Sequence, residues 1–137
     1  MIPRGDTSAV ERRAVPAVSP QAAVVGYARA VRVENLVYVA GTAPVMPDGE
    51  EPPADAYGQA RRCLEIVVAA LAELGAAPEH VVRTRIFVMR PEIWPEVGRA
   101  HGEVFADVRP ATAMVVVAAL LDPRWLVEIE ADAIVPS

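Results

Sequence analysis

The alternation of apolar and polar positions along the chain predicts five β-strands. Two β-rich runs, residues 28–33 and 36–41, are separated only by Glu34-Asn35, which predicts a tight hairpin turn. Alternation over residues 81–89 predicts a strand with one buried face, and a similar alternation returns over residues 126–134. A sheet therefore draws its strands from most of the chain.

The alternating strands sort their side chains into two rows. Along residues 81–89 the predicted buried row is Val82, Thr84, Ile86 and Val88, and the opposite row is Arg83, Arg85 and Phe87. Along residues 126–134 the rows are Val127, Ile129, Ala131 and Ala133 against Glu128, Glu130 and Asp132. The strand predicted over residues 112–118 differs, because it is apolar on both faces, as in a strand covered on both sides.

A repeat of apolar residues at three- and four-residue steps predicts a long helix over residues 55–75. Asp55 can cap its start, Gly75 ends it, and Pro78 follows just beyond. Its apolar stripe consists of Ala60, Cys63, Leu64, Val67, Leu71 and Leu74. A weaker pattern over residues 92–105 predicts a second helix.

The predicted order is β-β-α-β-α-β-β, which indicates an α/β (α+β) fold with a mixed sheet and two helices packed on one face. Two helices cover one face only, so further copies of the chain are the simplest cover for the strand over residues 112–118. We expect a single domain over residues 21–137. Residues 1–20 are predicted to be a poorly fixed leader, with a short edge strand around residues 13–18.

Composition narrows the possible classes of protein. The 137 residues suffice for one domain, and 53% of them are apolar but only 5% aromatic, so aliphatic side chains must form the core. No apolar run approaches the roughly 20 residues that span a bilayer, and the first residues do not resemble a signal peptide. A net charge of −5 argues against an extended nucleic-acid surface. We therefore expect a cytoplasmic protein that binds neither nucleic acid nor membranes.

Cysteine and histidine provide few candidates for chemistry. The single cysteine, Cys63, excludes an internal disulfide, and its place in the apolar stripe favours core packing. The two histidines, His80 and His101, lie in different segments, so no metal site is expected. His101 is expected to be structural, with a role at a subunit interface or cleft as the alternative.

Three carboxylates, those of Glu128, Glu130 and Asp132, share one strand face. They can form a solvated face. If that face instead meets a neighbouring subunit, a carboxylate there lies in an intersubunit cleft. Burial would then raise its pKa toward values useful for acid–base chemistry. Both interpretations remain open.

Arg29 lies on an apolar strand just after Tyr27. An arginine on an edge strand can extend to water. Its guanidinium can also grip a substrate carboxylate through two parallel hydrogen bonds, with the Tyr27 hydroxyl in the same pocket. Arg109, before the strand over residues 112–118, is expected to be a solvated or interface charge.

Together these segments resemble the RidA/YjgF family, also named after endoribonucleases of the L-PSP type. The resemblance covers about residues 22–135. It rests on Gly26-Tyr27-Ala28-Arg29-Ala30-Val31, Leu36-Val37-Tyr38-Val39-Ala40-Gly41-Thr42, Val81-Val82-Arg83-Thr84-Arg85-Ile86-Phe87-Val88, Arg109-Pro110-Ala111-Thr112-Ala113 and Val127-Glu128-Ile129-Glu130-Ala131.

The resemblance implies a chorismate-mutase-like homotrimer with a central β-barrel, helices outside and three clefts between subunits. It also implies hydrolysis of enamine and imine intermediates to a keto acid and ammonia, without a cofactor. By position in the motifs, Glu128 would position or activate water, and Tyr27 and Gly41 would line the pocket. We also expect Met114 to contact the small-molecule ligand in this cleft.

The chain departs from the family pattern where an active member has a substrate-binding arginine, because Thr112 occupies that position. Loss of a charge-assisted contact costs about 1.5–3 kcal/mol, or roughly ten- to hundredfold in binding. Arg29 is a candidate replacement. Two functions are therefore considered: hydrolysis of a small enamine or imine, and non-catalytic or stress-protective binding in the same cleft. An RNA-cleaving role is disfavoured by the acidic balance.

Overall fold

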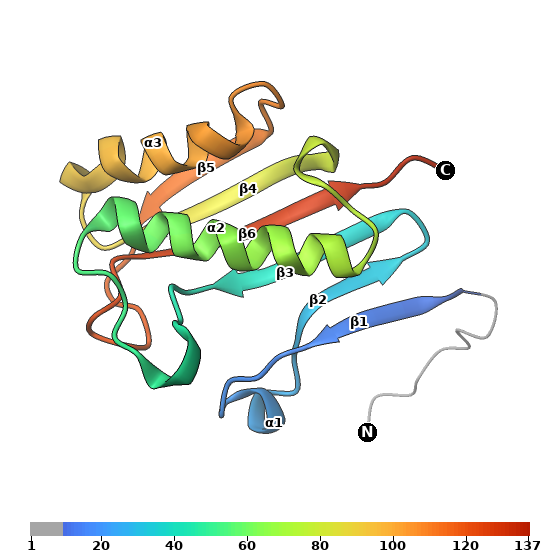
Figure 1. Ribbon diagram of the computed structural model, residues 1–137, viewed down its shortest axis with the longest axis horizontal. Coiled ribbons are helices and arrows are strands. Elements are labelled where there is room, and N and C mark those ends of the chain that lie inside the picture. Colours follow the sequence, from blue (N-terminus) through green and yellow to red (C-terminus); the bar gives the residue numbers. More distant parts are fainter. Residues whose placement is uncertain (1–9) are drawn as a thin grey trace.

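A computed structural model describes residues 10–137, and a six-stranded sheet forms its frame (Figure 1). The strands are β1 Arg12–Pro16, β2 Ala28–Val33, β3 Leu36–Thr42, β4 Val81–Val88, β5 Ala111–Val116 and β6 Val127–Ile134. The helices are α1 Ala22–Val25, α2 Ala56–Glu73 and α3 Trp94–Phe105, with short 3₁₀ turns at Pro47–Gly49, Pro78–His80 and Pro91–Ile93. The predicted order of elements is confirmed, with β1 and α1 preceding it.

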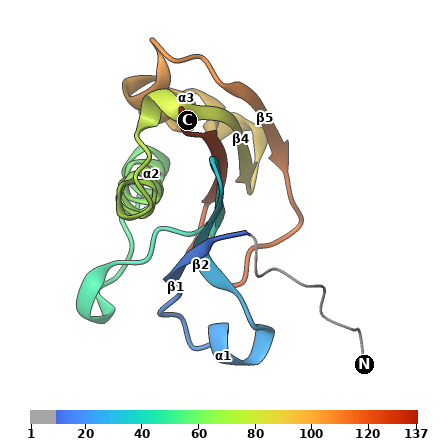
Figure 2. The ribbon, with the colours of Figure 1, turned by 90° about the vertical axis from the view of Figure 1, so that its right-hand side faces the viewer.

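The two long helices, α2 and α3, pack against each other on one face of the sheet (Figure 2). Across the sheet the strands follow the order β1-β2-β3-β6-β4-β5. The β4–β5 pair is parallel, with α3 as its crossover, and the other pairs are antiparallel. The predicted mixed sheet with two helices on one face is confirmed.

The β1 strand forms one edge of the sheet. It pairs antiparallel with β2, from Arg12 opposite Val33 to Pro16 opposite Ala28. The short edge strand that the sequence predicted around residues 13–18 is therefore present. Of the predicted leader, residues 1–9 lie outside the described residues, whereas residues 12–16 belong to the sheet.

The helix α2 forms between the two predicted ends. The Asp55 side chain accepts a hydrogen bond from the backbone N–H of Gly58 at 2.9 Å, which satisfies one of the free donors of the first turn. Gly75 has a φ of +78°, in the left-handed region that glycine tolerates. The predicted apolar stripe is buried, including Cys63, whose thiol packs in the core as expected.

One residue of the predicted buried row lies on the wrong face. Val82 is 45% exposed, whereas Val81 is 3% exposed. The register between β4 and β6 shifts between Val81 and Arg83, and such an irregularity turns one residue out of the alternation. From Thr84 onward the predicted alternation of β4 is confirmed.

The strand β5, predicted to be covered on both faces, lies at the edge of the sheet and is largely exposed in the single chain. Val115 is 46% exposed and Val116 is 53% exposed. Tyr38, on β3, is 47% exposed as well. Residues 10–137 by themselves therefore leave an apolar strand and part of the helix-free face uncovered.

Gln59 on α2 ties the helix to the two segments beside it. Its Nε2 donates to the carbonyl oxygens of Pro53, at 2.8 Å, and Arg124, at 2.9 Å. Its Oε1 accepts from the backbone N–H of Leu126 at 2.7 Å. The amide is 1% exposed and uses both ends, so it holds the segment that enters β6 against α2.

We expect Gln59→Leu to lower the free energy of unfolding by at least about 2 kcal/mol, because two carbonyls and one N–H lose their partner in a partly buried place. Chemical denaturation followed by tryptophan fluorescence measures this change. Gln21→Leu is the matched control, since Gln21 is exposed, and should change stability little. Equal stability of both variants would contradict the role of Gln59.

Candidate functional site

The strands β2, β3 and β6 bring together Arg29, Gly41 and Glu128, three of the residues predicted from the sequence. The Nη2 of Arg29 donates to the carbonyl oxygen of Gly41 at 2.6 Å. A Cβ at Gly41 would lie 3.1 Å from the Oε2 of Glu128. A larger residue would crowd the carboxylate, so Gly41 provides the space in which the Glu128 side chain lies.

The local irregularity of β3 explains why the Gly41 backbone is available. The register between β3 and β6 shifts between Val39 and Thr42, and Gly41 lies inside this irregularity. A bulge interrupts the regular ladder of hydrogen bonds. The Gly41 carbonyl can therefore accept from the guanidinium of Arg29.

Burial and charge act in opposite directions on Glu128. Burial raises its pKa, the nearby Arg29 lowers it, and the like charge of Glu130 raises it further. Within residues 10–137 the Glu128 carboxylate forms no salt bridge. It is therefore a partly buried carboxylate whose pKa is raised, as a group that exchanges protons requires.

One hydrogen-bond donor of Arg29 has no partner among the described residues. Burial lowers the pKa of its guanidinium, and its Nε is buried without an acceptor among the described residues. A buried donor left without a partner costs roughly 1–3 kcal/mol. An oxygen acceptor supplied by a ligand or by water would remove that cost.

Arg29 and Tyr27 line the same cavity of about 580 Å³. Its other walls are the segment before Tyr27, the loop after β3, α2 and the loop before β6. The Tyr27 hydroxyl hydrogen-bonds with the side chain of Ser19. This cavity places a guanidinium and a phenol against one space, on the side of Arg29 where Tyr27 lies.

The three carboxylates of β6 do not share one environment. Glu130 and Asp132 both pair with Arg85 of β4, at 3.1 and 3.3 Å. These two carboxylates therefore share one positive charge on the sheet surface. Glu128 is the member of this row that faces Arg29 and Gly41 instead.

Thr112 and Met114 do not join this group within one chain. They lie on β5, which β4 and β6 separate from β3, and line a second cavity of about 440 Å³ together with His101 and Arg109. The Thr112 hydroxyl lies 2.8 Å from the hydroxyl of Thr84. The predicted site residues thus form two groups on one subunit.

Thr84 is the polar residue whose role the sequence analysis missed. It is fully buried and contacts both Thr112 and His101 through its hydroxyl. The available signal was a polar residue inside a row predicted to be buried. A buried hydroxyl needs a hydrogen-bond partner, and only the tertiary structure shows that the partners of Thr84 are Thr112 and His101.

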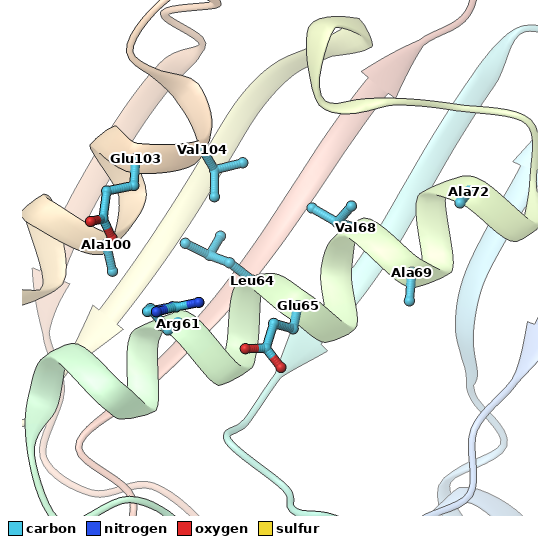
Figure 3. Close-up of a pocket in the computed structure, with 9 residues that line it drawn as sticks. All are labelled: Arg61, Leu64, Glu65, Val68, Ala69, Ala72, Ala100, Glu103 and Val104. Carbon is cyan, nitrogen blue, oxygen red and sulfur yellow. The ribbon is translucent and has the colours of Figure 1, made fainter.

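A third cavity, of about 620 Å³, lies between α2 and α3 (Figure 3). Apolar side chains line most of it, and Arg61, Glu65 and Glu103 contribute the charged groups. None of the predicted site residues lies there. The chemistry of this groove is that of a helix surface.

Two further findings concern the described part of the chain. Residues 10–137 contain no group of three or more His, Cys, Asp or Glu side chains placed to hold a metal ion. No helix among these residues is both long and apolar enough to cross a membrane.

We expect Arg29→Gln to raise the pKa of Glu128 further, because the positive charge that holds it down is removed. Because the raised pKa belongs to the folded state, stability falls as the pH rises through it, and this loss should grow in the variant. Titration of isotope-labelled glutamate side chains by NMR measures the change. Arg85→Gln, beside Glu130, should shift Glu128 less, and an unchanged Glu128 titration in Arg29→Gln would refute the coupling.

A family model described as Endoribonuclease L-PSP matches residues 17–135. An uncharacterized protein of Streptomyces coelicolor is 39% identical over 127 residues, covering 93% of this chain and 94% of its own.

Solved structures share the fold. A Mycobacterium tuberculosis member of the YjgF/YER057c/UK114 family is 44% identical with a TM-score of 0.83, covering 91% of this chain and 100% of its own. Escherichia coli TdcF, solved with bound serine, is 28% identical with a TM-score of 0.77, and the match covers 90% of this chain and 94% of the TdcF chain. The resemblance stated from the sequence motifs is confirmed, and the chain belongs to the RidA/YjgF family.

Proposed function

We propose that this protein hydrolyses a small enamine or imine to a carbonyl compound and ammonia, in a cleft between subunits. The observation that carries the proposal is the placement of Glu128. A carboxylate with a raised pKa lies against Gly41 and beside a guanidinium with a free donor. The family to which the chain belongs supports the reaction class.

The proposed reaction needs one carboxylate that exchanges protons. Glu128 accepts a proton from water as the oxygen adds to the carbon of the C=N bond, and passes that proton to nitrogen, which gives a carbinolamine. Glu128 then accepts the hydroxyl proton of the carbinolamine and donates it to the nitrogen. The C–N bond breaks, ammonia leaves, and the C=O bond forms, which returns Glu128 to its starting carboxylate. Imine and water thus become carbonyl compound and ammonia without oxidant, reductant or cofactor.

Arg29 and Tyr27 supply the proposed contacts for the substrate. A guanidinium binds a carboxylate through charge-assisted hydrogen bonds, and Arg29 lines the cavity together with Tyr27. Serine, the molecule bound to TdcF, carries a carboxylate and a nitrogen on one carbon, as a 2-imino acid does. The proposed substrate class is therefore a small 2-imino acid or its enamine.

We also propose that the protein is a cytoplasmic homotrimer whose helix-free sheet faces line a central barrel. The exposed side chains of Tyr38 and Val115 support it, because contact with further copies would remove this apolar surface from water. In that arrangement a neighbour's Thr112 and Met114 would face the ligand cleft. Each subunit would consist of the domain predicted over residues 21–137 together with the edge strand β1.

A second candidate function is non-catalytic binding of a small carboxylate, or stress protection, in the same cleft. Thr112 favours it, because a neutral hydroxyl stands where an arginine would hold the substrate. The cavity beside Arg29 would then retain a ligand without turning it over. The two functions differ in one observable, the loss of imine.

An assay of imine lifetime distinguishes hydrolysis from non-catalytic binding. A pyridoxal-phosphate dehydratase generates 2-iminopropanoate or 2-iminobutanoate in situ, and semicarbazide traps what survives. We expect this protein to shorten the imine lifetime, and Glu128→Gln to lose the effect at least about 100-fold, as expected for removal of an acid–base group.

Glu130→Gln is the matched control for this assay. Glu130 lies on the same strand face but pairs with Arg85, so its loss should leave most of the activity. No acceleration by the wild-type protein at high concentration would remove these substrates and favour the binding function.

Carboxylate binding is predicted to depend on Arg29 under both functions. We expect Arg29→Ala to weaken the binding of 2-oxobutanoate, measured by calorimetry, by roughly tenfold or more. Arg62→Ala, in the same cavity wall, tests whether any cation suffices. Unchanged affinity in Arg29→Ala would show that Arg29 is not the anchor.

A further inference from the structure

A continuous chain of hydrogen bonds links His101 of α3 to Thr112 of β5. The Nε2 of His101 lies 2.8 Å from the Oγ1 of Thr84, which lies 2.8 Å from the Oγ1 of Thr112. The Oγ1 of Thr112 donates to the carbonyl oxygen of Pro110 at 3.0 Å. Because β4 and β5 are parallel with Thr84 opposite Thr112, the two hydroxyls share one side of the sheet.

Counting protons fixes the direction of this chain. A carbonyl oxygen only accepts, so the single hydroxyl proton of Thr112 goes to Pro110. Thr112 must then accept a hydrogen bond from Thr84, so the single hydroxyl proton of Thr84 points to Thr112. Thr84 can only accept from His101, whose Nε2 must carry a proton.

The surroundings of His101 are consistent with a neutral ring protonated at Nε2. The ring packs on Phe105 with centroids 4.7 Å apart, and burial lowers the pKa of His101. A neutral imidazole has one N–H, and the chain of hydroxyls requires it at Nε2. Nδ1 makes no hydrogen bond to the described residues.

We propose that His101, acting through Thr84, sets Thr112 as a hydrogen-bond donor toward an oxygen acceptor of the ligand, in the place where active relatives would have an arginine. His101 and Thr84 are positioning residues, and Thr112 is the group that touches the ligand. The inference rests on the proposed placement of Thr112 in the ligand cleft. It names an acceptor oxygen, a carboxylate or a carbonyl, as the group recognised there.

Binding of the ligand requires only that the Thr112 hydroxyl rotate. Thr112 turns its proton from the Pro110 carbonyl to the ligand oxygen, while it continues to accept from Thr84. The donors upstream stay in place, and hydrogen bonds in a chain strengthen one another. The cavity of about 440 Å³ that Thr112, Met114 and His101 line gives the ligand room beside this hydroxyl.

The position of the proton on His101 is the direct test. Two-bond ¹H–¹⁵N NMR spectra of the free protein distinguish protonation at Nε2 from protonation at Nδ1. We expect Nε2–H for His101. His80 is the internal reference, because its Nδ1 accepts from the backbone N–H of Ala77 and so must also carry its proton at Nε2 when neutral. A His101 protonated at Nδ1 overturns the proposal.

Variants test the effect on the ligand, with 2-oxobutanoate as the probe. Thr84→Val removes the link without changing shape, and we expect affinity to fall about two- to tenfold, close to the loss in Thr112→Val. Thr84→Ser retains the hydroxyl and should restore binding. His101→Gln places an N–H near the same point and should bind better than His101→Phe.

Two outcomes of the variant series would overturn the proposal. One is unchanged affinity in Thr84→Val while Thr112→Val binds more weakly, since the relay then has no effect on Thr112. The other is a His101 signal that does not respond to saturating 2-oxobutanoate. Glu128→Gln separates this inference from the proposed reaction, because it should abolish imine turnover and leave the His101 proton at Nε2.

Discussion

The one-sided cover of the sheet is the constraint on which the rest of the structure depends. Because α2 and α3 occupy one face, β6 must direct its apolar row toward them and its acidic row away. The alternation of a strand makes both demands compatible. Glu128 can therefore lie on a central strand of the sheet without placing a charge in the core.

Local backbone features determine which carboxylate of that row lies beside Arg29 and has a raised pKa. The irregularity of β3 at Gly41 leaves room for the Glu128 side chain and an accepting carbonyl for Arg29. Glu130, one position further along the same face, pairs with Arg85 instead. Burial that raises the pKa of Glu128 is thus only partly offset by Arg29, which leaves a carboxylate suited to proton exchange.

In the proposed site, the second group of residues would take the place of a charged anchor. An arginine can only donate hydrogen bonds, whereas the Thr112 hydroxyl can donate or accept, so its neighbours determine where its proton points. Thr84 and His101 are placed to direct that proton, through parallel pairing of β4 with β5 and the packing of α3 above them. Because this group and the Glu128 group are separate within a subunit, a shared ligand site would require a second copy of the chain.

The sequence by itself determined the order of elements, the long helix from Asp55 to Gly75 and the two rows of β6, because these follow from local periodicity and caps. It also determined the family, through motifs spread over most of the chain. Only the tertiary structure decided which face Val82 occupies and which carboxylate meets Arg29. These depend on bulges and on pairing between strands distant in sequence, and neither leaves a periodic signal in the residues themselves.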